Sequence, residues 1–278
     1  MLRELEHFVA VAAAGTFTAA ARRVHLSQPA LTASIQRLEH ELGAPLFDRG
    51  RRGATLTAAG QAFLARAQAS LAAFADGKRA VGEIQGLAAG EVRIGGGATA
   101  CTYLLPPVLA RFRRAYPGIH LAMREGYTDE LEQAVDAGAL DLAVITIDRG
   151  RPPGGPLERL GRTDDELIVV AAPDCDPATA PWITFAPGSP TRALLLERVP
   201  DATVVMELGS IAAVKGNVRA GIGMALVSRV AVATDLARGS LVEVPRRWTP
   251  LRRRLGVRHR GQAHLTPAAT ALLGLLRG

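Results

Sequence analysis

The stretch Leu26–Leu46, which reads LSQPALTASIQRLEHELGAPL, decides how the first part of this chain folds. Ser27 can cap the free N–H groups of a helix, Pro29 is tolerated in a first turn, and Gly43 stops a helix. These signals predict one helix over Gln28–Leu42. Its apolar residues recur every three or four positions, so they form one stripe that must face a core. The stripe consists of Leu31, Ile35, Leu38 and Leu42.

The opposite face of this helix carries no acidic residue until the helix end, and its side chains are short, uncharged or basic. Such a face can approach a polyanion, as a helix that enters a DNA major groove must do. The residues on this face are Pro29, Thr32, Ala33, Gln36, Arg37 and His40.

Two shorter helices are predicted before it. Apolar residues recur at helical spacing over Leu2–Ala12, and Gly15 ends that helix. Thr16 or Thr18 then caps a second helix that runs through Val24. Three short helices joined by tight turns, the third with an acid-poor outer face, are typical of a helix-turn-helix arrangement. An ordinary three-helix bundle would show the same periodicity.

A hairpin with a basic tip is predicted next. The apolar pair Leu46 and Phe47 is followed by the turn Asp48–Gly53, and Ala54–Thr57 returns as an extended run. A solvated turn would explain the charges equally well. Directly after a recognition helix, the tip favours a wing that reaches phosphates or the minor groove. The arginines of the turn are Arg49, Arg51 and Arg52.

A longer helix is predicted from Thr57 to about Leu87. Its apolar residues alternate at spacings of three and four, which suits a helix that packs on a copy of itself. It can also lie on its own domain. Later glycines indicate a linker around residues 86–91. The seam proposed for dimerisation consists of Leu64, Ala67, Leu71, Phe74 and Val81.

The remainder alternates apolar strands with helices in βαβαβ order, the pattern of a mainly parallel sheet covered by helices. The first set of segments is Glu91–Gly95, Pro106–Tyr116, Ile119–Glu125, Leu131–Ala137 and Leu140–Ile147. A second set is Leu167–Ala172, Trp182–Phe185, Thr191–Val199, Thr203–Glu207, Ile211–Ala220, Met224–Ser228, Ala231–Arg238 and Leu241–Val244. The strand Leu251–His259 and the helix Thr266–Leu276 complete the chain. The fold class is therefore α+β for the first part and α/β for the rest.

The composition is that of a globular protein with two domains. The chain has 278 residues, of which 48% are hydrophobic, and a net charge of +7 that favours an anionic partner without identifying it. Cys101 and Cys175 form no close-spaced motif, which is typical of reduced thiols in a cytosolic protein. No apolar run approaches the ~20 residues that span a bilayer. We therefore expect a cytoplasmic protein with no membrane span, and no spacing of its histidines and cysteines suggests a metal or cofactor.

Several of these stretches together resemble the LysR-type transcriptional regulators. The winged-helix part of that resemblance is carried by Phe17–Ala21 (FTAAA), Leu26–Leu31 (LSQPAL), Leu42–Gly43, Pro45–Phe47 and Leu56–Gly60. Looser similarity continues through Tyr103–Pro106, Gly188–Arg192, Gly209–Ser210 and Gly221–Leu226. The resemblance implies a winged helix-turn-helix over residues 1–58, a linker and dimerisation helix over 59–90, and an effector domain over 91–278. It also implies a homodimer or homotetramer on double-stranded DNA.

The resemblance assigns roles in DNA binding residue by residue. Base edges would be met by Ser27, Gln28, Pro29 and Thr32. Phosphates or the minor groove would be met by Thr16, Arg37, Arg49, Arg51 and Arg52. Gln36 joins these candidates from its place on the outer face. Many members carry additional arginines where this chain has Ala33 and Gln36, so we expect fewer phosphate contacts and a shallower salt dependence.

The effector domain implied by the resemblance has two subdomains of periplasmic-binding-protein type. Subdomain I would take residues 91–161 and 263–278, and subdomain II residues 162–262. A small, anionic effector would lie between them, and Arg192 could hold a carboxylate or sulfate through two hydrogen bonds. The candidate residues are Thr99, Cys101, Thr102, Thr128, Thr146, Ser189, Thr191 and Arg192.

The glycine-rich turn after the strand Glu91–Gly95 leaves other interpretations open. Gly95, Gly97 and Ala100 match a dinucleotide fingerprint, which gives an NAD(P)-dependent oxidoreductase as the alternative function. Against it, Pro106 suggests that the next helix begins well beyond the glycines. A glycine-rich turn that binds nothing is a third interpretation, and an oxidant-sensing thiol at Cys101 is a fourth. The expected function is a sequence-specific transcriptional regulator that is not an enzyme.

Overall fold

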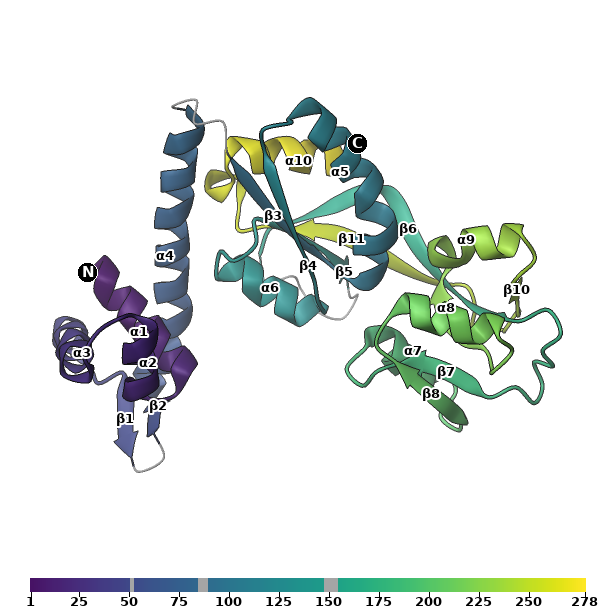
Figure 1. Cartoon of the computed structure of the whole chain (residues 1–278), viewed down its shortest axis with the longest axis horizontal. Helices are drawn as coiled ribbons and strands as arrows, with labels where there is room; N and C mark the ends of the chain where they lie inside the picture. The colour runs from purple at the N-terminus through teal and green to yellow at the C-terminus, as the bar shows by residue number, and fades with distance from the viewer. Residues whose placement is uncertain (51–52, 85–89, 148–154) are drawn as a thin grey trace. The chain divides into compact units, whose positions relative to one another are not determined.

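The computed structural model describes the whole chain except residues 51–52, 85–89 and 148–154. The chain forms two compact units, one of residues 1–87 with 133–140 and the other of residues 88–132 with 141–278 (Figure 1). Within the described ranges, no helix is both long and apolar enough to cross a membrane. The bounds of the three domains proposed from the sequence stay predictions.

Short helices and a hairpin make up the first unit, and a long helix follows them. The helix α3 has the predicted bounds, because Ser27 Oγ accepts the Ala30 N–H at 3.3 Å and Gly43 ends the helix in a left-handed conformation with φ of 68°. Thr16, not Thr18, caps the second helix. The elements are α1 (Leu2–Ala14), α2 (Phe17–Arg23), α3 (Gln28–Leu42), β1 (Phe47–Gly50), β2 (Gly53–Leu56) and α4 (Ala58–Ile84).

The apolar stripe of α3 faces the core of this unit, with one exception. Leu31, Ile35 and Leu38 are at most 1% exposed, whereas Leu42 is 42% exposed. The prediction for Leu42 is wrong because this residue lies in the last turn of α3, beyond the buried cluster. Ser34 is buried on the same helix, and its Oγ lies 2.7 Å from His7 Nδ1, which satisfies a polar group inside the core.

The predicted hairpin is present and is joined to α3 by a carboxylate. Strands β1 and β2 pair antiparallel, with Phe47 opposite Leu56. Glu39 Oε1 accepts the N–H of Leu46 at 2.8 Å and that of Phe47 at 3.3 Å. Glu39 therefore sets where the hairpin begins relative to α3.

The helix α4 uses half of the predicted seam within its own unit. Ala67 is 1% exposed, and Leu64 and Leu71 pack beside it on the core of the winged helix. Phe74 and Val81 are 52% and 55% exposed. The alternative that α4 lies on its own domain thus holds for its first half, and the dimerisation seam stays a prediction.

Subdomain I is built on a parallel sheet. Strand β3 pairs in parallel with β4 and with β5, which confirms the predicted βαβαβ order. Its apolar core lies between this sheet and the helices α5 and α10. The elements are β3 (Glu91–Gly96), η1 (Ala100–Leu104), α5 (Leu105–Ala115), β4 (His120–Glu125), α6 (Thr128–Asp136), β5 (Leu142–Ile147) and α10 (Pro267–Arg277).

The first helix of subdomain I begins earlier than predicted. Helical backbone starts at Ala98, directly after the glycines, and passes through the π-helical turn η1 into α5. The Leu105 N–H donates to the carbonyl of Ala100, five residues back. Since Pro106 has no N–H to donate, this wider turn carries the helix past it. The predicted helix start at Pro106 was therefore wrong.

Subdomain II has a small parallel pair, β7 with β8, and strand β9, which pairs with β6. Trp182 and Leu195 belong to one of its two buried clusters, and Val214 and Val218 to the other. The elements are β6 (Leu157–Ala171), β7 (Trp182–Phe185), α7 (Pro190–Arg198), β8 (Val204–Leu208), α8 (Ile211–Arg219), β9 (Ala225–Ser228), α9 (Arg229–Ala237), β10 (Val242–Glu243), β11 (Leu251–Arg258) and η2 (Gln262–His264).

Two long antiparallel strands, β6 and β11, connect the subdomains (Figure 1). Strand β6 starts ten residues before the predicted Leu167 because its first half carries charged residues that hide the apolar pattern. Strand β11 pairs with β5 of subdomain I from Arg254 onward and with β6 along its length. The sequence placed the return to subdomain I near residue 262, later than this pairing begins.

Replacing Glu39 tests whether its carboxylate holds the hairpin. Glu39→Ala leaves the Leu46 and Phe47 N–H groups without this acceptor, so we expect the winged helix to lose about 1–3 kcal/mol. Glu39→Gln keeps a side-chain oxygen acceptor and should lose less. Amide hydrogen exchange at Leu46 and Phe47 measures the effect, and equal protection in Glu39→Ala and the parent would contradict it.

Candidate functional site

The outer face of α3 is open to solvent, as a reading surface must be. Gln28, Pro29, Gln36 and Arg37 are exposed, and Thr32 is half-buried. No acidic residue lies in the first turn of the helix. Arg37 Nη2 lies 3.6 Å from Glu4 Oε1, a long ion pair on the surface that leaves the guanidinium accessible.

Two of the remaining DNA-binding candidates cap helices, and three are arginines whose side chains the structure does not describe. The hydroxyls of Thr16 and Ser27 accept N–H groups at the starts of α2 and α3, so capping accounts for both, and each hydroxyl can still donate to a phosphate. The side chain of Arg49 and the residues Arg51 and Arg52 lie outside the described part of the chain. The roles of all these residues in DNA binding stay predictions.

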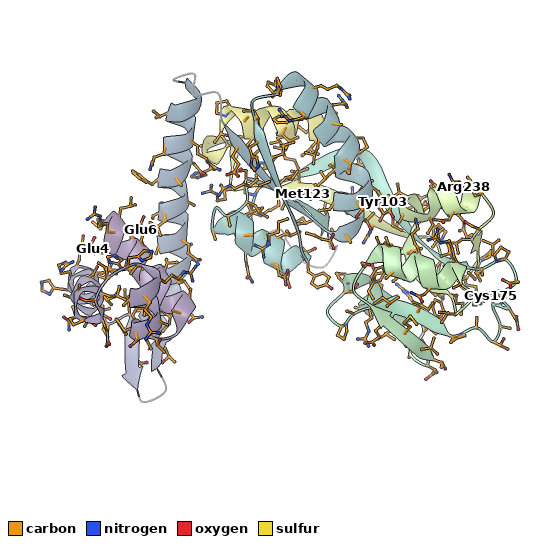
Figure 2. All side chains as sticks on the ribbon, viewed as in Figure 1. Glu4, Glu6, Tyr103, Met123, Cys175 and Arg238 are labelled. Carbon is orange, nitrogen blue, oxygen red and sulfur yellow. The ribbon has the colours of Figure 1, made fainter. Side chains whose placement is uncertain are left out.

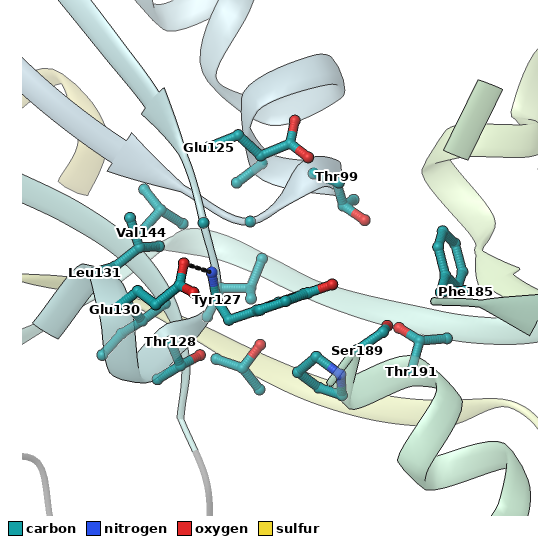
Figure 3. Close-up of a pocket in the computed structure, with 18 of the residues that line it drawn as sticks. Thr99, Glu125, Tyr127, Thr128, Glu130, Leu131, Val144, Phe185, Ser189 and Thr191 are labelled. Atoms are coloured by element: carbon teal, nitrogen blue, oxygen red, sulfur yellow. Dashed lines mark hydrogen bonds between the residues drawn. The ribbon is translucent and has the colours of Figure 1, made fainter. Parts of the chain in front are cut away.

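A cavity of about 220 Å³ lies where the two subdomains face each other (Figure 3). Subdomain I contributes the turn after β3, the start of α6 and the end of β5. Subdomain II contributes the start of α7 and residues near α8. Strand β11, which runs from one subdomain to the other, also lines the cavity. Five of the eight predicted effector residues line it: Thr99, Thr128, Thr146, Ser189 and Thr191.

The cationic group of this cavity is Arg253, which the sequence analysis missed. Arg253 Nε donates to Asp165 Oδ2 at 2.5 Å, and Nη2 donates to Thr99 Oγ1 at 3.0 Å. Asp165 is 4% exposed and also accepts the Ser228 hydroxyl. Among the described residues, none is within hydrogen-bonding reach of Arg253 Nη1. Arg253 thus has donor capacity left for a ligand.

Arg253 belongs to a basic run that was interpreted mostly as a solvated strand face. Arg252 and Arg254 are exposed, in keeping with that interpretation, but Arg258 is 2% exposed. The sequence could have indicated that Arg253 differs from Arg252 and Arg254, because every second side chain of a strand points to the same side. Strand alternation alone does not indicate which side of β11 borders the cavity.

Ser189 stands out among the residues at helix starts. Thr16, Ser27, Ser210 and Thr266 each cap their helix by accepting an N–H at 3.2–3.3 Å. Ser189 precedes α7 but makes no such bond, although it is 7% exposed. Within the described chain its hydroxyl has no hydrogen-bond partner, and it lines the cavity (Figure 3).

The first N–H groups of α7 are therefore not capped by a side chain. The opening N–H groups of a helix have no partner inside it, and they carry a partial positive charge. Together with Ser189 and Thr191 they form a wall of hydrogen-bond donors. Such a wall favours a carboxylate or sulfate oxygen.

Acidic side chains line the same cavity and restrict where an anion can sit. Glu125 is the last residue of β4, and Glu130 Oε2 accepts the Tyr127 N–H at 3.4 Å (Figure 3). The Tyr127 ring extends across the cavity toward the side of Ser189 and Phe185 (Figure 3). An anion is therefore expected near α7 and Arg253, away from the two carboxylates.

Three predicted effector residues do not line the cavity. Arg192 Nη2 donates to Glu207 Oε1, because α7 directs this side chain toward β8. Thr102 is exposed elsewhere. Cys101 is 5% exposed and its Sγ donates to the Gly96 carbonyl at 3.3 Å. Arg192 thus faces Glu207 and not the cavity, and its predicted two-bond contact with a carboxylate or sulfate stays a prediction.

The state of Cys101 also bears on the redox interpretation. Burial raises the pKa of the Cys101 thiol to about 11, and the Glu125 carboxylate adds to the rise. A thiol reacts with oxidants as the thiolate, so a raised pKa makes it slow. This environment is the reverse of an acidified thiol at a helix start.

A second contact joins the subdomains away from the cavity. Lys215 of α8 places its Nζ 5.7 Å from the centre of the Tyr103 ring, which belongs to η1 (Figure 2). The same ammonium lies 2.8 Å from Asp235 Oδ2 and donates to the Ala231 carbonyl. A cation over an aromatic face is attracted by about 0.5–1 kcal/mol at a partly exposed site. The arrangement of the subdomains therefore has a polar contact beyond β6 and β11.

A larger hollow of about 890 Å³ adjoins the first. It borders β11 at Arg252, Arg253 and Arg254, and only Thr128 and Thr146 of the predicted effector residues line it. Its wall mixes acidic with basic side chains. The smaller cavity is the better candidate because donors converge there from both subdomains.

Known protein families match almost the whole chain. The model described as "Bacterial regulatory helix-turn-helix protein, lysR family" matches residues 2–61, and that described as "LysR substrate binding domain" matches residues 85–278. The first match covers α1–α3 and the hairpin, and the second covers both subdomains with their cavity.

Named proteins align over the same length. The HTH-type transcriptional regulator CbbR of Rhodospirillum rubrum is 32% identical, with 99% of this chain and 95% of that protein covered. The uncharacterized HTH-type transcriptional regulator YeiE of Escherichia coli K12 is 33% identical, with coverages of 98% and 95%. The structure of full-length OxyR from Pseudomonas aeruginosa superposes with a TM-score of 0.68 at 25% identity, covering 99% of this chain and 93% of OxyR.

Thiol labelling checks the environment of Cys101. In Cys175→Ser, where Cys101 is the remaining thiol, we expect iodoacetamide to react slowly at pH 8, because a pKa of about 11 leaves about one thiol in a thousand ionised. The rate should rise about tenfold per pH unit from 8 to 10. Rapid labelling at pH 8 would contradict this, and Cys101→Ser, which keeps the half-exposed Cys175 (Figure 2), serves as the accessible control.

Proposed function

The chain belongs to the LysR family of DNA-binding transcriptional regulators, and from this premise we propose that a small anionic molecule in the cavity between its subdomains modulates its action at DNA. The family accounts for the winged helix and the two-subdomain fold. The effector, its charge and its coupling to DNA are the proposed part.

The main support for an anionic effector is the position of Ser189 at the start of α7. Ser189 is buried, has no partner among the described residues, and stands at the start of a helix whose first N–H groups it does not cap. Its hydroxyl borders the cavity and is open to solvent there, so a ligand that accepts its hydrogen bond meets a donor that the protein already holds in place. The positive end of the α7 dipole favours a negative acceptor.

Arg253 supports the same choice. Its Nη1 has no partner within the described residues, while Asp165 and Thr99 hold the rest of the guanidinium. A guanidinium fixed by two neighbours is already oriented, so it loses little side-chain entropy when it binds an anion. The residues proposed to contact the effector are Thr99, Thr128, Thr146, Ser189, Thr191 and Arg253.

The proposed mechanism is a shift in population between arrangements of the subdomains. A ligand that touches Ser189 of subdomain II and Thr128 of subdomain I binds most tightly when both are close, so it favours that arrangement. In a homo-oligomer, the change alters how paired winged helices sit on their half-sites. Phe74 and Val81, exposed on α4, are available for the contact between copies.

We further propose that the chain is not an oxidoreductase. The early start of helical backbone at Ala98 removes the reason given above against a dinucleotide at Gly95 and Gly97. Another reason replaces it. Glu125 and Glu130 line the cavity beside this turn, where their carboxylates would repel a pyrophosphate. NADH should therefore show no change in fluorescence on mixing with the protein.

Titration calorimetry with sulfate, acetate and succinate tests the anion site. For the probe that binds the parent, we expect Ser189→Ala to raise Kd about tenfold, because a hydrogen bond to a charged group contributes roughly 1.5–3 kcal/mol. Ser70→Ala, which removes a hydroxyl from α4, is the matched control and should bind as the parent does. Equal affinity of the parent and Ser189→Ala would count against the site.

DNase footprinting of the parent tests the coupling to DNA. With the same anion at saturation, we expect the protected region to change, since the proposed subdomain arrangement sets how the winged helices are spaced. Ser189→Ala should need a correspondingly higher anion concentration. If the footprint and the transcription level stay the same with bound anion, the proposed coupling between anion binding and DNA binding is wrong. The anion site itself is not contradicted by that result.

A further inference from the structure

The first residue of the recognition helix is held by a residue of the preceding helix. Thr18, the second residue of α2, donates from Oγ1 to Oε1 of Gln28, the first residue of α3, at 3.3 Å. Both side chains are exposed. The contact therefore lies on the open surface from which α3 would meet DNA.

This bond is not explained by local backbone chemistry. A threonine near a helix start often bonds to a neighbouring N–H, but Thr16 already accepts the Ala19 N–H and caps α2. Thr18 and Gln28 are ten residues apart and meet across the turn between the helices. The turn is tight, with His25 at φ of 56° and the Leu26 N–H donating to the Ala21 carbonyl. The helix-turn-helix geometry itself brings the two side chains together.

The bond matters because the two ends of a glutamine amide read bases differently. A free glutamine pairs with adenine through both ends: Oε1 accepts from N6 and Nε2 donates to N7. Nε2 alone is a pure donor, and it suits an edge that offers only acceptors. Guanine offers two adjacent acceptors, N7 and O6, whereas the cytosine amino group offers a donor.

We propose that Thr18 is a positioning residue that sets the base preference of Gln28. Its hydroxyl keeps the Oε1 end of the amide against α2 and leaves the Nε2 end for the major groove. Gln28 then selects guanine at the base pair it meets, instead of the adenine that an unrestrained glutamine selects. This inference rests on the assignment of Gln28 to a base edge and is independent of the effector.

Selection from a randomised duplex pool, followed by binding to single base-pair variants of the selected site, tests the proposal. The full-length parent should select guanine at one position where Gln28→Ala has no preference. Thr18→Val keeps the branched shape but lacks the hydroxyl, so Oε1 is free, and we expect the preference at that position to move toward adenine by about fivefold or more. Thr18→Ser keeps the hydroxyl and should select guanine as the parent does.

Several results would overturn the proposal. If Thr18→Val keeps the guanine preference of the parent, the hydroxyl does not orient the amide. If the affinity of Thr18→Val falls equally for every site, Thr18 is a phosphate contact. If Gln28→Ala keeps the full preference of the parent, Gln28 does not read a base, while DNA binding by the winged helix still stands. Circular dichroism melting of each variant separates these outcomes from a loss of fold.

Discussion

Strands β6 and β11 run antiparallel over most of their length, and this pairing is the constraint on which the two-subdomain part of the chain depends. Each strand passes from one subdomain to the other, so their ladder of hydrogen bonds belongs to both. Arg253 of β11 and Asp165 of β6 are partners in that ladder and also form an ion pair. The pairing therefore places a guanidinium at the cavity without any contribution from loops.

The hydroxyls at helix starts are of two kinds: those that accept a helix N–H and those that make no such bond. Where a threonine or serine caps its helix, as Thr16 and Ser27 do, its acceptor is used and the helix start is stable. Where the cap is missing, as at Ser189, both the hydroxyl and the helix N–H groups remain open to another molecule. This difference is the basis for proposing Ser189, rather than one of the capping residues, as a contact of the effector.

The winged helix was largely predictable because its signals are local. Ser27 and Gly43 mark the ends of α3 through chemistry that involves only nearby backbone, and the observed helix has those ends. Leu42 was misjudged because periodicity gives a face but not the extent of the core that covers it. The seam on α4 was ambiguous for a related reason, since Leu64 and Leu71 fit equally well against their own domain or a copy.

The sequence by itself determined the family, the recognition helix, and the alternation of strands and helices, because each follows from neighbouring residues. Only the tertiary structure decided which polar groups face the cavity. Arg253 reaches Asp165 and Thr99, which are 88 and 154 positions away, and Arg192 is taken by Glu207. A charged side chain binds a ligand only if its neighbours in space leave donors unused, and those neighbours are set by folding.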